Sequence, residues 1–165
     1  ALGYFDGYEK GLKYEGENYG KHVAVDPFQK SDWGNSGKES VKRAGIADVV
    51  EHVSQDSLTY LPQLASTVAS TGRTFDFILV DGGHWFENAF IDLFFALRLV
   101  RPGGLVAIDD LWMPAVKNAV RYATTNLGAL QEVRTDLPES KRFALLRSPM
   151  QPPKRMWDHF VPFAV

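Results

Sequence analysis

Acidic residues that follow short apolar runs carry the clearest chemistry in this sequence. Asp26, Asp81 and the pair Asp109-Asp110 each come directly after such a run, and Asp56 follows another run by a few residues. In a parallel α/β sheet the carboxyl ends of the strands meet at one edge, and ligands bind there. We therefore expect these acids, which are far apart in the chain, to converge on one site.

Asp81, Asp109 and Asp110 would together offer three carboxylates at that edge. A hard divalent cation such as Mg²⁺ prefers oxygen ligands and keeps some of its water. Three neighbouring negative charges repel one another unless a cation or protons neutralise them. The plainer alternative is that one of these acids caps the next helix while another is solvated. The residue types leave both alternatives open.

His84 stands three residues after Asp81. A neutral imidazole at this place could ligate a metal or act as a general base. His84 and Asp81 are therefore the candidate catalytic residues. The competing interpretation is structural, because a lone histidine more often has that role.

Asp26 and the pair Asp56-Ser57 have the residue types of a nucleoside site. A carboxylate at a strand end can accept hydrogen bonds from both hydroxyls of a ribose. Because Pro27 follows it, Asp26 could equally begin an Asx-type turn. Asp56-Ser57 could contact an adenine ring, or Asp56 could be the N-cap of the helix that begins there. Both interpretations remain open at both places.

Two periodicities alternate along the chain and predict the elements that position these residues. Apolar runs predict strands at 22–26, 49–53, 75–80 and 105–108, and Val133 with 143–146 suggests a closing hairpin. Helical spacing predicts helices at 2–12, 38–44, 57–68, 86–100 and 115–127. Strands that alternate with helices indicate an α/β fold with a mostly parallel sheet and helices on both faces.

Two glycine pairs and several aromatic residues lie beside the acids. Gly82-Gly83 lets the backbone come close to a ligand, whereas Pro102-Gly103-Gly104 indicates only a helix stop and a tight turn. The aromatic side chains near the acids could pack on a flat ligand or could serve core or lid packing; they are Phe28, Trp85 and Trp112.

Composition excludes several classes of protein. The chain has 165 residues, of which 45% are hydrophobic and 23% are charged, and this is typical of one globular domain. The net charge of −2 favours neither nucleic acid nor an acidic membrane surface as a partner. The absence of cysteine excludes disulfides and thiolate metal sites. No apolar run reaches the ~20 residues of a membrane span, and no signal peptide is visible, so a cytoplasmic location is the default expectation.

The order of the motifs resembles that of class I S-adenosylmethionine-dependent methyltransferases. The similarity runs over about residues 20–147. The motifs that carry it are His22-Val-Ala-Val-Asp26-Pro-Phe-Gln29, Val41-Lys-Arg-Ala-Gly45, Gln55-Asp56-Ser57, Phe75-Asp-Phe-Ile-Leu-Val-Asp81-Gly-Gly-His84, Leu99-Val-Arg-Pro-Gly-Gly104 and Ile108-Asp-Asp110. The branch that it resembles most has an aspartate-glycine-x-histidine motif and a paired aspartate after the next strand.

The resemblance implies a Rossmann-like sheet of seven strands with an antiparallel last strand, and S-adenosylmethionine as cofactor. It implies that Asp26 binds the cofactor ribose and that Asp56 with Ser57 contacts adenine. It extends the cofactor site to four further residues, which are Pro27, Phe28, Asp81 and Gly82. Acids similar to Asp81, Asp109 and Asp110 hold Mg²⁺ in metal-dependent O-methyltransferases, so it also implies O-methylation of a small molecule.

One motif of the family is absent, namely the first strand with its glycine-rich turn. The expected helix at 2–12 resembles the helix that follows this turn, so the first strand is expected to be missing and the domain (1–147) to be incomplete at its N-terminus. Because that strand lies between the second and the fourth, strands 22–26 and 75–80 should flank one sheet position. Upstream residues, a rearranged N-terminus or another chain would fill it. Residues 148–165, rich in proline and aromatic residues, are expected to form a separate arm.

Two other functions remain as alternatives. The first is a metal-dependent hydrolase or hydroxylase that uses His84 with the three carboxylates, because histidine with carboxylates is a ligand set for iron. The second is a non-catalytic methyltransferase-like module for binding or oligomerisation, which would agree with the absent glycine motif and with a homo-oligomer. The methyl acceptor cannot be inferred from these residues.

Overall fold

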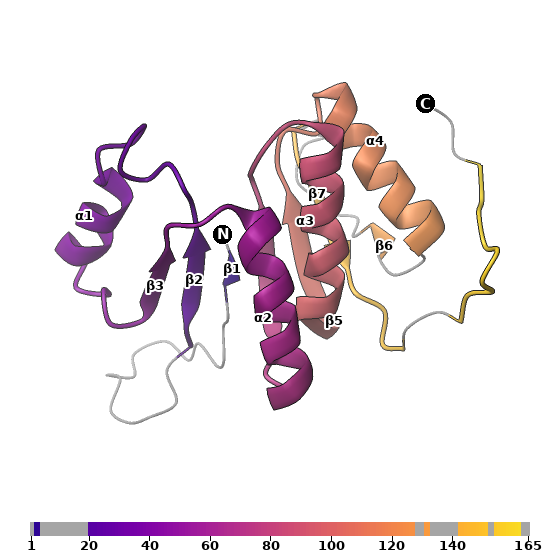
Figure 1. Ribbon diagram of the computed structural model, residues 1–165, viewed down its shortest axis with the longest axis horizontal. Helices are drawn as coiled ribbons and strands as arrows, with labels where there is room; N and C mark the ends of the chain where they lie inside the picture. Colours follow the sequence, from indigo (N-terminus) through magenta and orange to yellow (C-terminus); the bar gives the residue numbers. More distant parts are fainter. Residues whose placement is uncertain (1, 4–19, 128–130, 133–141, 152–153, 163–165) are drawn as a thin grey trace.

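The computed structural model describes residues 2–3, 20–127, 131–132, 142–151 and 154–162, and one seven-stranded sheet organises them (Figure 1). The strand order is β3-β2-β1-β4-β5-β7-β6. The strands are β1 (Leu2–Gly3), β2 (His22–Val25), β3 (Val50–Val53), β4 (Phe75–Val80), β5 (Val100–Ile108), β6 (Gln131–Glu132) and β7 (Ala144–Arg147). The helices are α1 (Ser36–Arg43), α2 (Ser57–Thr71), α3 (Phe86–Leu99), α4 (Pro114–Tyr122) and the π-helix η1 (Ala123–Leu127).

The directions of the strands confirm the predicted α/β architecture. β2 pairs in parallel with β3, and β4 pairs in parallel with β5. β7 runs antiparallel to β5 and to β6, so the sheet closes with the predicted hairpin. Val133, which was expected to belong to that hairpin, lies outside the described residues.

The sheet position between β2 and β4 exists, and the N-terminus of the chain itself occupies it. β1 pairs antiparallel with both neighbours, with Leu2 opposite Val23 on one side and Ile78 on the other. The predicted sheet position between these two strands is thus confirmed, and a rearranged N-terminus fills it. The expectation of a helix beginning at Leu2 is corrected. The rest of the expected helix, residues 4–12, lies outside the described residues. The described pairing of β1 covers two residues of each neighbour.

α2 shows how local sequence sets both ends of a helix. The Asp56 side chain accepts a hydrogen bond from the Leu58 N–H at 2.7 Å, as an N-cap residue does. Gly72 ends the helix in the left-handed region at φ 70°, where a residue without Cβ is favoured. The predicted cap is therefore present, and it places Asp56 at the carboxyl edge of the sheet.

α3 ends at Leu99, and β5 begins at Val100. The Pro-Gly-Gly segment lies inside β5 and does not form the separate turn that was expected. The pairing of β4 with β5 shifts register between Phe75 and Phe77, beside this segment. A Cβ on Gly104 would lie 2.6 Å from Val100 Cγ2 and 2.9 Å from the Asp76 carbonyl oxygen. Only glycine fits at this close approach of the two strands.

Three helices form a layer over the sheet, with α3 between α2 and α4 (Figure 1). The least exposed large side chains lie between this layer and the central strands; they are Ile78, Leu93, Leu99, Val106, Ile108 and Leu146. The single helix expected at 115–127 is instead α4 followed by η1, a change of helical pitch at Ala123. None of the helices described here is long and apolar enough to cross a membrane.

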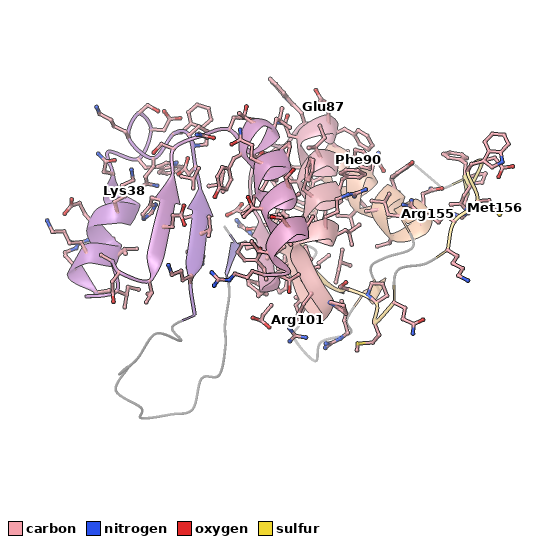
Figure 2. All side chains as sticks on the ribbon, turned by 60° about the horizontal axis from the view of Figure 1, so that its bottom comes forward. Lys38, Glu87, Phe90, Arg101, Arg155 and Met156 are labelled. Atoms are coloured by element: carbon pink, nitrogen blue, oxygen red, sulfur yellow. The ribbon has the colours of Figure 1, made fainter. Side chains whose placement is uncertain are left out.

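Residues 148–151 and 154–162 form a C-terminal arm, and Figure 2 shows Arg155 and Met156 on it. Asn126 of η1 is buried and holds this arm through its side-chain amide. Its Nδ2 donates to the Val161 carbonyl oxygen at 2.9 Å, and its Oδ1 accepts from the Val161 N–H at 2.6 Å. Arg155 donates to the Asn126 carbonyl oxygen at 3.2 Å. Trp157 remains 94% exposed on the arm.

Candidate functional site

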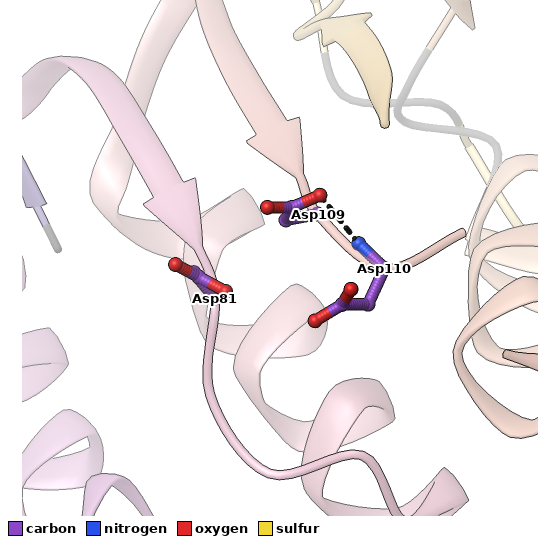
Figure 3. A group of neighbouring side chains, drawn as sticks. All are labelled: Asp81, Asp109 and Asp110. Carbon is purple, nitrogen blue, oxygen red and sulfur yellow. Dashed lines mark hydrogen bonds between the residues drawn. The ribbon is translucent and has the colours of Figure 1, made fainter. Parts of the chain in front are cut away.

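The acids at the ends of β4 and β5 meet as their positions predict (Figure 3). Asp81 follows β4, and Asp109 and Asp110 follow β5. One ligand atom from each of the three carboxylates lies within 4.8 Å of the other two. This arrangement offers hard oxygen ligands to a divalent cation.

Arg142, which immediately precedes the β7 region, binds Asp109. Its Nε lies 3.1 Å from Asp109 Oδ1 and its Nη2 lies 3.4 Å from Oδ2. The Asp110 N–H donates to Asp109 Oδ1 at 2.7 Å. These partners hold the pKa of Asp109 below its ordinary value, with the backbone hydrogen bond from Asp110 as the first cause and Arg142 as the second. Asp109 therefore carries its charge with a cationic partner already in place.

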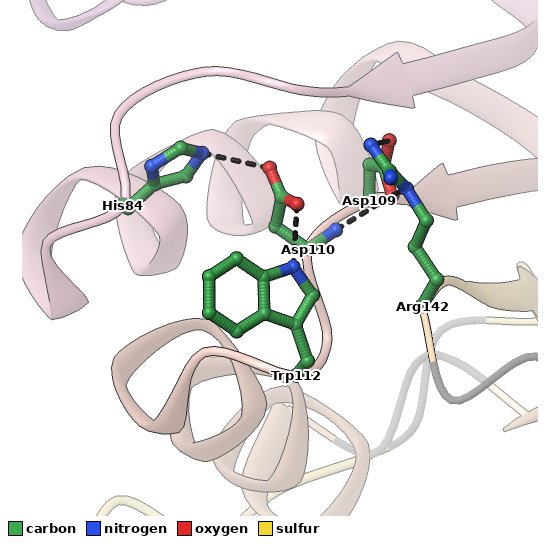
Figure 4. A network of polar contacts seen from close by, with 5 residues as sticks. All are labelled: His84, Asp109, Asp110, Trp112 and Arg142. Carbon is green, nitrogen blue, oxygen red and sulfur yellow. Dashed lines mark hydrogen bonds and ion pairs between the residues drawn. The ribbon is translucent and has the colours of Figure 1, made fainter.

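Asp110 connects His84 to Trp112 (Figure 4). Its Oδ2 lies 2.8 Å from His84 Nε2, and its Oδ1 accepts from Trp112 Nε1 at 2.8 Å. Asp110 has φ 57°, a left-handed conformation that non-glycine residues seldom adopt. The backbone thus turns back at Asp110 so that one carboxylate serves both rings. This contact with His84 was not expected from the sequence, which placed Asp110 only among metal ligands.

Asp81 lies at the surface, yet its surroundings raise its pKa. Partial loss of hydration is the larger cause, and the negative charges of Asp109 and Asp110 add to it. None of the three acids caps the helix that follows it, because α3 begins after Trp85 and α4 begins after Met113, both without a side-chain cap. The geometry thus sets aside helix capping as the role of these acids.

A cavity of about 660 Å³ opens at the carboxyl edge, between the ends of β2 and β4. It has the size range of small-molecule sites. Its lining includes most of the residues named from the sequence, which are Asp26, Pro27, Phe28, Asp56, Ser57, Asp81, Gly82 and His84. Asp109 and Asp110 stand outside this lining, behind Asp81 and His84.

Asp26 forms the turn that its position before Pro27 suggested. Its Oδ1 accepts from the Phe28 N–H at 2.8 Å, and its Oδ2 accepts from Gln29 Nε2 at 2.9 Å. Gln29 in turn accepts from the Gly37 N–H at 2.8 Å, which connects the loop to α1. A carboxylate has about four acceptor positions, so Asp26 can still bind two further donors from the cavity.

Three residues that sequence reasoning missed belong to the site. Arg142 binds Asp109, and Asp92 and His52 line the cavity. Among the described residues, only His52 Nε2 and Asp92 Oδ1 are buried side-chain polar atoms without a hydrogen-bond partner. The signal for Asp92 was present, since it interrupts the apolar stripe of a helix.

The residue types and the comparisons point to one family. A family model described as "Methyltransferase domain" matches residues 9–111, more than half of the chain. The chain belongs to this methyltransferase family. The class I S-adenosylmethionine-dependent resemblance drawn from the sequence is thereby confirmed. No curated protein matches the sequence.

Solved structures of similar fold agree with the family. Cofactor-bound Rv0187 from MTB has a TM-score of 0.61 and 21% identity over 80% of this chain and 63% of its own. The O-methyltransferase from Bacillus cereus in complex with SAH has a TM-score of 0.59 and 20% identity. The match covers 78% of this chain and 63% of the Bacillus cereus protein. TomG, an O-methyltransferase from Streptomyces achromogenes in complex with SAM, has a TM-score of 0.56 and 23% identity. The match covers 79% of this chain and 62% of TomG.

At these identities the likeness shows the fold. The methyltransferase domain described here spans a little under two thirds of the length of these relatives. The Rossmann-like architecture expected from the sequence is therefore confirmed for this chain.

Proposed function

We propose that this methyltransferase domain transfers the methyl group of S-adenosylmethionine to an oxygen atom of a small molecule. One observation carries the proposal: a single cavity brings Asp26, Asp56 and Ser57 together with Asp81 and His84. The first three have the chemistry of a nucleoside site, and the last two have that of an acid–base site. Two proteins of similar structure are O-methyltransferases in complex with SAH or SAM, and they support the choice of donor and acceptor atom.

The residues that would hold the cofactor fit its shape and charge. Asp26 would accept hydrogen bonds from the ribose hydroxyls, beside Pro27 and the exposed ring of Phe28. Asp56 and Ser57 would contact the adenine. The Gly82 backbone comes close to the Asp92 carboxylate, since a Cβ there would lie 3.0 Å from Asp92 Oδ2. The negative charge of Asp81 would also favour a cationic sulfonium.

His84 would take the proton from the acceptor hydroxyl. Asp110 accepts the Nε2–H of the ring, so Nδ1 is the nitrogen left to bind a proton. Holding the acceptor oxygen and the sulfonium methyl in line would supply much of the rate, because positioning turns a bimolecular step into an effectively unimolecular one.

The donor set of Asp81, Asp109 and Asp110 fits a hard divalent cation, and we propose it as a Mg²⁺ site. A bound cation would bind the acceptor oxygen and lower the pKa of its hydroxyl. Arg142 and His84 are the present partners of Asp109 and Asp110, so they would compete with the cation for these carboxylates. We further propose a small molecule as the acceptor and a cytoplasmic location.

Calorimetric titration of the chain with S-adenosylmethionine tests the donor. Binding at micromolar concentration is expected. Transfer of an isotopically labelled methyl group from the cofactor to a panel of small hydroxyl compounds would then be measured. No binding at millimolar cofactor would overturn the proposed function. It would favour the non-catalytic alternative, and tightly bound iron without cofactor binding would favour the hydrolase or hydroxylase.

A further inference from the structure

The side-chain amide of Gln29 is hydrogen-bonded at both of its ends. Its Nε2 donates to Asp26 Oδ2 at 2.9 Å, and its Oε1 accepts from the Gly37 N–H at 2.8 Å. The opposite orientation of the amide would bring two acceptors together and two donors together, so the partners fix the orientation. A carboxylate or an apolar side chain of similar length cannot make both contacts. Gln29 therefore acts on Asp26 and on α1 at the same time.

On the side of α1, Gln29 supplies a cap that the local sequence does not. Asn35 precedes the helix with φ 63°, and its side chain makes no capping hydrogen bond. Gly37 lies in the first turn, where backbone N–H groups have no partner within the helix. Gln29 Oε1 satisfies the N–H of Gly37, and the Gln29 carbonyl oxygen accepts from the Asn35 N–H at 2.7 Å. The start of α1 thus holds Gln29 by its main chain and by its side chain.

On the side of the cavity, Gln29 completes the hold on the Asp26 carboxylate. The Phe28 N–H binds Asp26 Oδ1 at 2.8 Å, and this bond alone would let the carboxylate rotate about its Cβ–Cγ bond. The second donor, on Oδ2, fixes the plane of the carboxylate. Each oxygen then keeps one acceptor position whose direction is set before a ligand binds. Building on the proposed function, we propose that Gln29 is a positioning residue, anchored on the N-terminus of α1, that orients Asp26 for the two ribose hydroxyls of the cofactor.

Gly37 leaves the room that this amide occupies. A Cβ on Gly37 would lie 2.8 Å from Gln29 Oε1 and 3.1 Å from Gln29 Nε2. A methyl group would therefore displace the amide from its partners, although alanine suits a helix better than glycine does. Gly37→Ala thus separates the orientation of Asp26 from the stability of α1.

The first test titrates S-adenosylhomocysteine calorimetrically into the unmodified chain and into Gln29→Glu. The new carboxylate keeps an acceptor for the Gly37 N–H but has no donor for Asp26. We expect binding to weaken about fivefold, the effect of one lost hydrogen bond. Gln63→Glu, at an exposed position of α2, makes the same change of charge and should stay within about twofold of the unmodified chain. Equal affinity in Gln29→Glu and in the unmodified chain would show that Gln29 only caps α1, and would overturn the proposal.

The second test asks whether Gln29 acts through Asp26. In an Asp26→Ala background, Gln29→Glu should change the affinity by less than about twofold, because no carboxylate is left to orient. A loss as large as that in the unmodified chain would contradict the assignment.

The third test uses Gly37→Ala, in which Asp26 and Gln29 are both unchanged. Binding of S-adenosylhomocysteine should weaken about fivefold while the urea midpoint does not fall. A lower urea midpoint with unchanged affinity would indicate a purely structural contact and would also overturn the proposal.

The two levels of the proposal fail in different ways. If the unmodified chain does not bind S-adenosylhomocysteine, the proposed function falls, and the role of Gln29 falls with it. If the unmodified chain and Gln29→Glu bind it equally well, the proposed function stands and only the role of Gln29 is lost.

Discussion

At the scale of single residues, several acids of the site are held by protein partners. Asp26 binds its own turn, Asp109 binds Arg142, and Asp110 binds His84 and Trp112. These contacts orient the carboxylates before any ligand arrives. Site residues that are held in advance lose less conformational entropy when they bind.

Asp26→Ala should weaken binding of S-adenosylhomocysteine by tenfold or more, because charge-assisted hydrogen bonds to two hydroxyls are lost. Asp26→Asn keeps an oxygen for the Phe28 N–H and so separates loss of the turn from loss of the charge. Asp32→Ala, in the same exposed loop, is the control. Calorimetry measures the affinities, and a loss below twofold in Asp26→Ala would remove Asp26 from the ribose site.

Asp92 should make stability fall as pH rises. Its pKa is raised in the folded chain, so between its ordinary pKa of about 3.9 and the raised value the folded state binds more protons than the unfolded state. The free energy of unfolding therefore decreases with increasing pH through this window. Urea unfolding across the window should show a shallower decrease in Asp92→Asn. If the free energy of unfolding changed with pH in the same way in the unmodified chain and in Asp92→Asn, the prediction would be contradicted.

Arg142→Ala should tighten Mg²⁺ binding, because the guanidinium that competes for Asp109 is removed. Arg73→Ala, an exposed arginine after α2, is the control for loss of positive charge alone. The half-saturating Mg²⁺ concentration is measured by calorimetry, and activity is measured before and after chelation. Full turnover after exhaustive chelation would exclude a catalytic metal and leave His84 as the acid–base group.

At the scale of elements, the connection from α3 to β5 shows the tightest packing of backbone. β5 begins directly where α3 ends, and Gly104 lies against β4 with no room for a side chain. This connection sets the position of β5 and hence of Asp109 and Asp110 at its far end. A glycine here thus acts on the site through the register of the sheet.

Gly104→Ala should destabilise the fold by about 3 kcal/mol, since both Val100 and the Asp76 carbonyl would have to move. Gly45→Ala is the comparison, because no atom lies within 4 Å of its Cβ position and only its φ of 71° is unfavourable. Gly45→Ala should lower the free energy of unfolding by about 1 kcal/mol. Urea unfolding gives both values, and an equal loss in the two variants would contradict the clash.

At the scale of the whole molecule, the first strand and the C-terminal arm complete the fold. β1 joins the two halves of the sheet, since it is the strand between β2 and β4. The C-terminal arm is joined to the body by the Asn126 side chain, which bonds both backbone polar groups of Val161. These contacts attach Leu2–Gly3 and Val161 to the rest of the described structure.

Asn126→Ala should release the arm and destabilise the fold by about 1–3 kcal/mol, because the Val161 backbone loses both partners. Trypsin should then cleave faster after Lys154 and Arg155. Asn118→Ala, in α4, is the matched control. Mass spectrometry follows the cleavage, and equal rates in the variant and the unmodified chain would show that Asn126 does not hold the arm.

The sequence by itself determined the strands and helices that carry the site. Strand β4 was predicted residue for residue, and the Asp56 cap and the meeting of Asp81 with Asp109-Asp110 followed from local patterns. These features were predictable because the alternation of apolar residues decides which side chains face the core. The carboxyl ends of parallel strands then share one edge whatever the detailed packing.

Only the tertiary structure decided the partners of those residues. Arg142 reaches Asp109 across 33 positions, and β1 pairs antiparallel in the slot where the family pattern led us to expect a missing strand. Only the packing of α3 shows that Asp92 Oδ1 is buried without a hydrogen-bond donor among the described residues, while Ser57 bonds to the same side chain. Such contacts depend on how elements distant in the chain pack, and a local pattern contains no information on that packing.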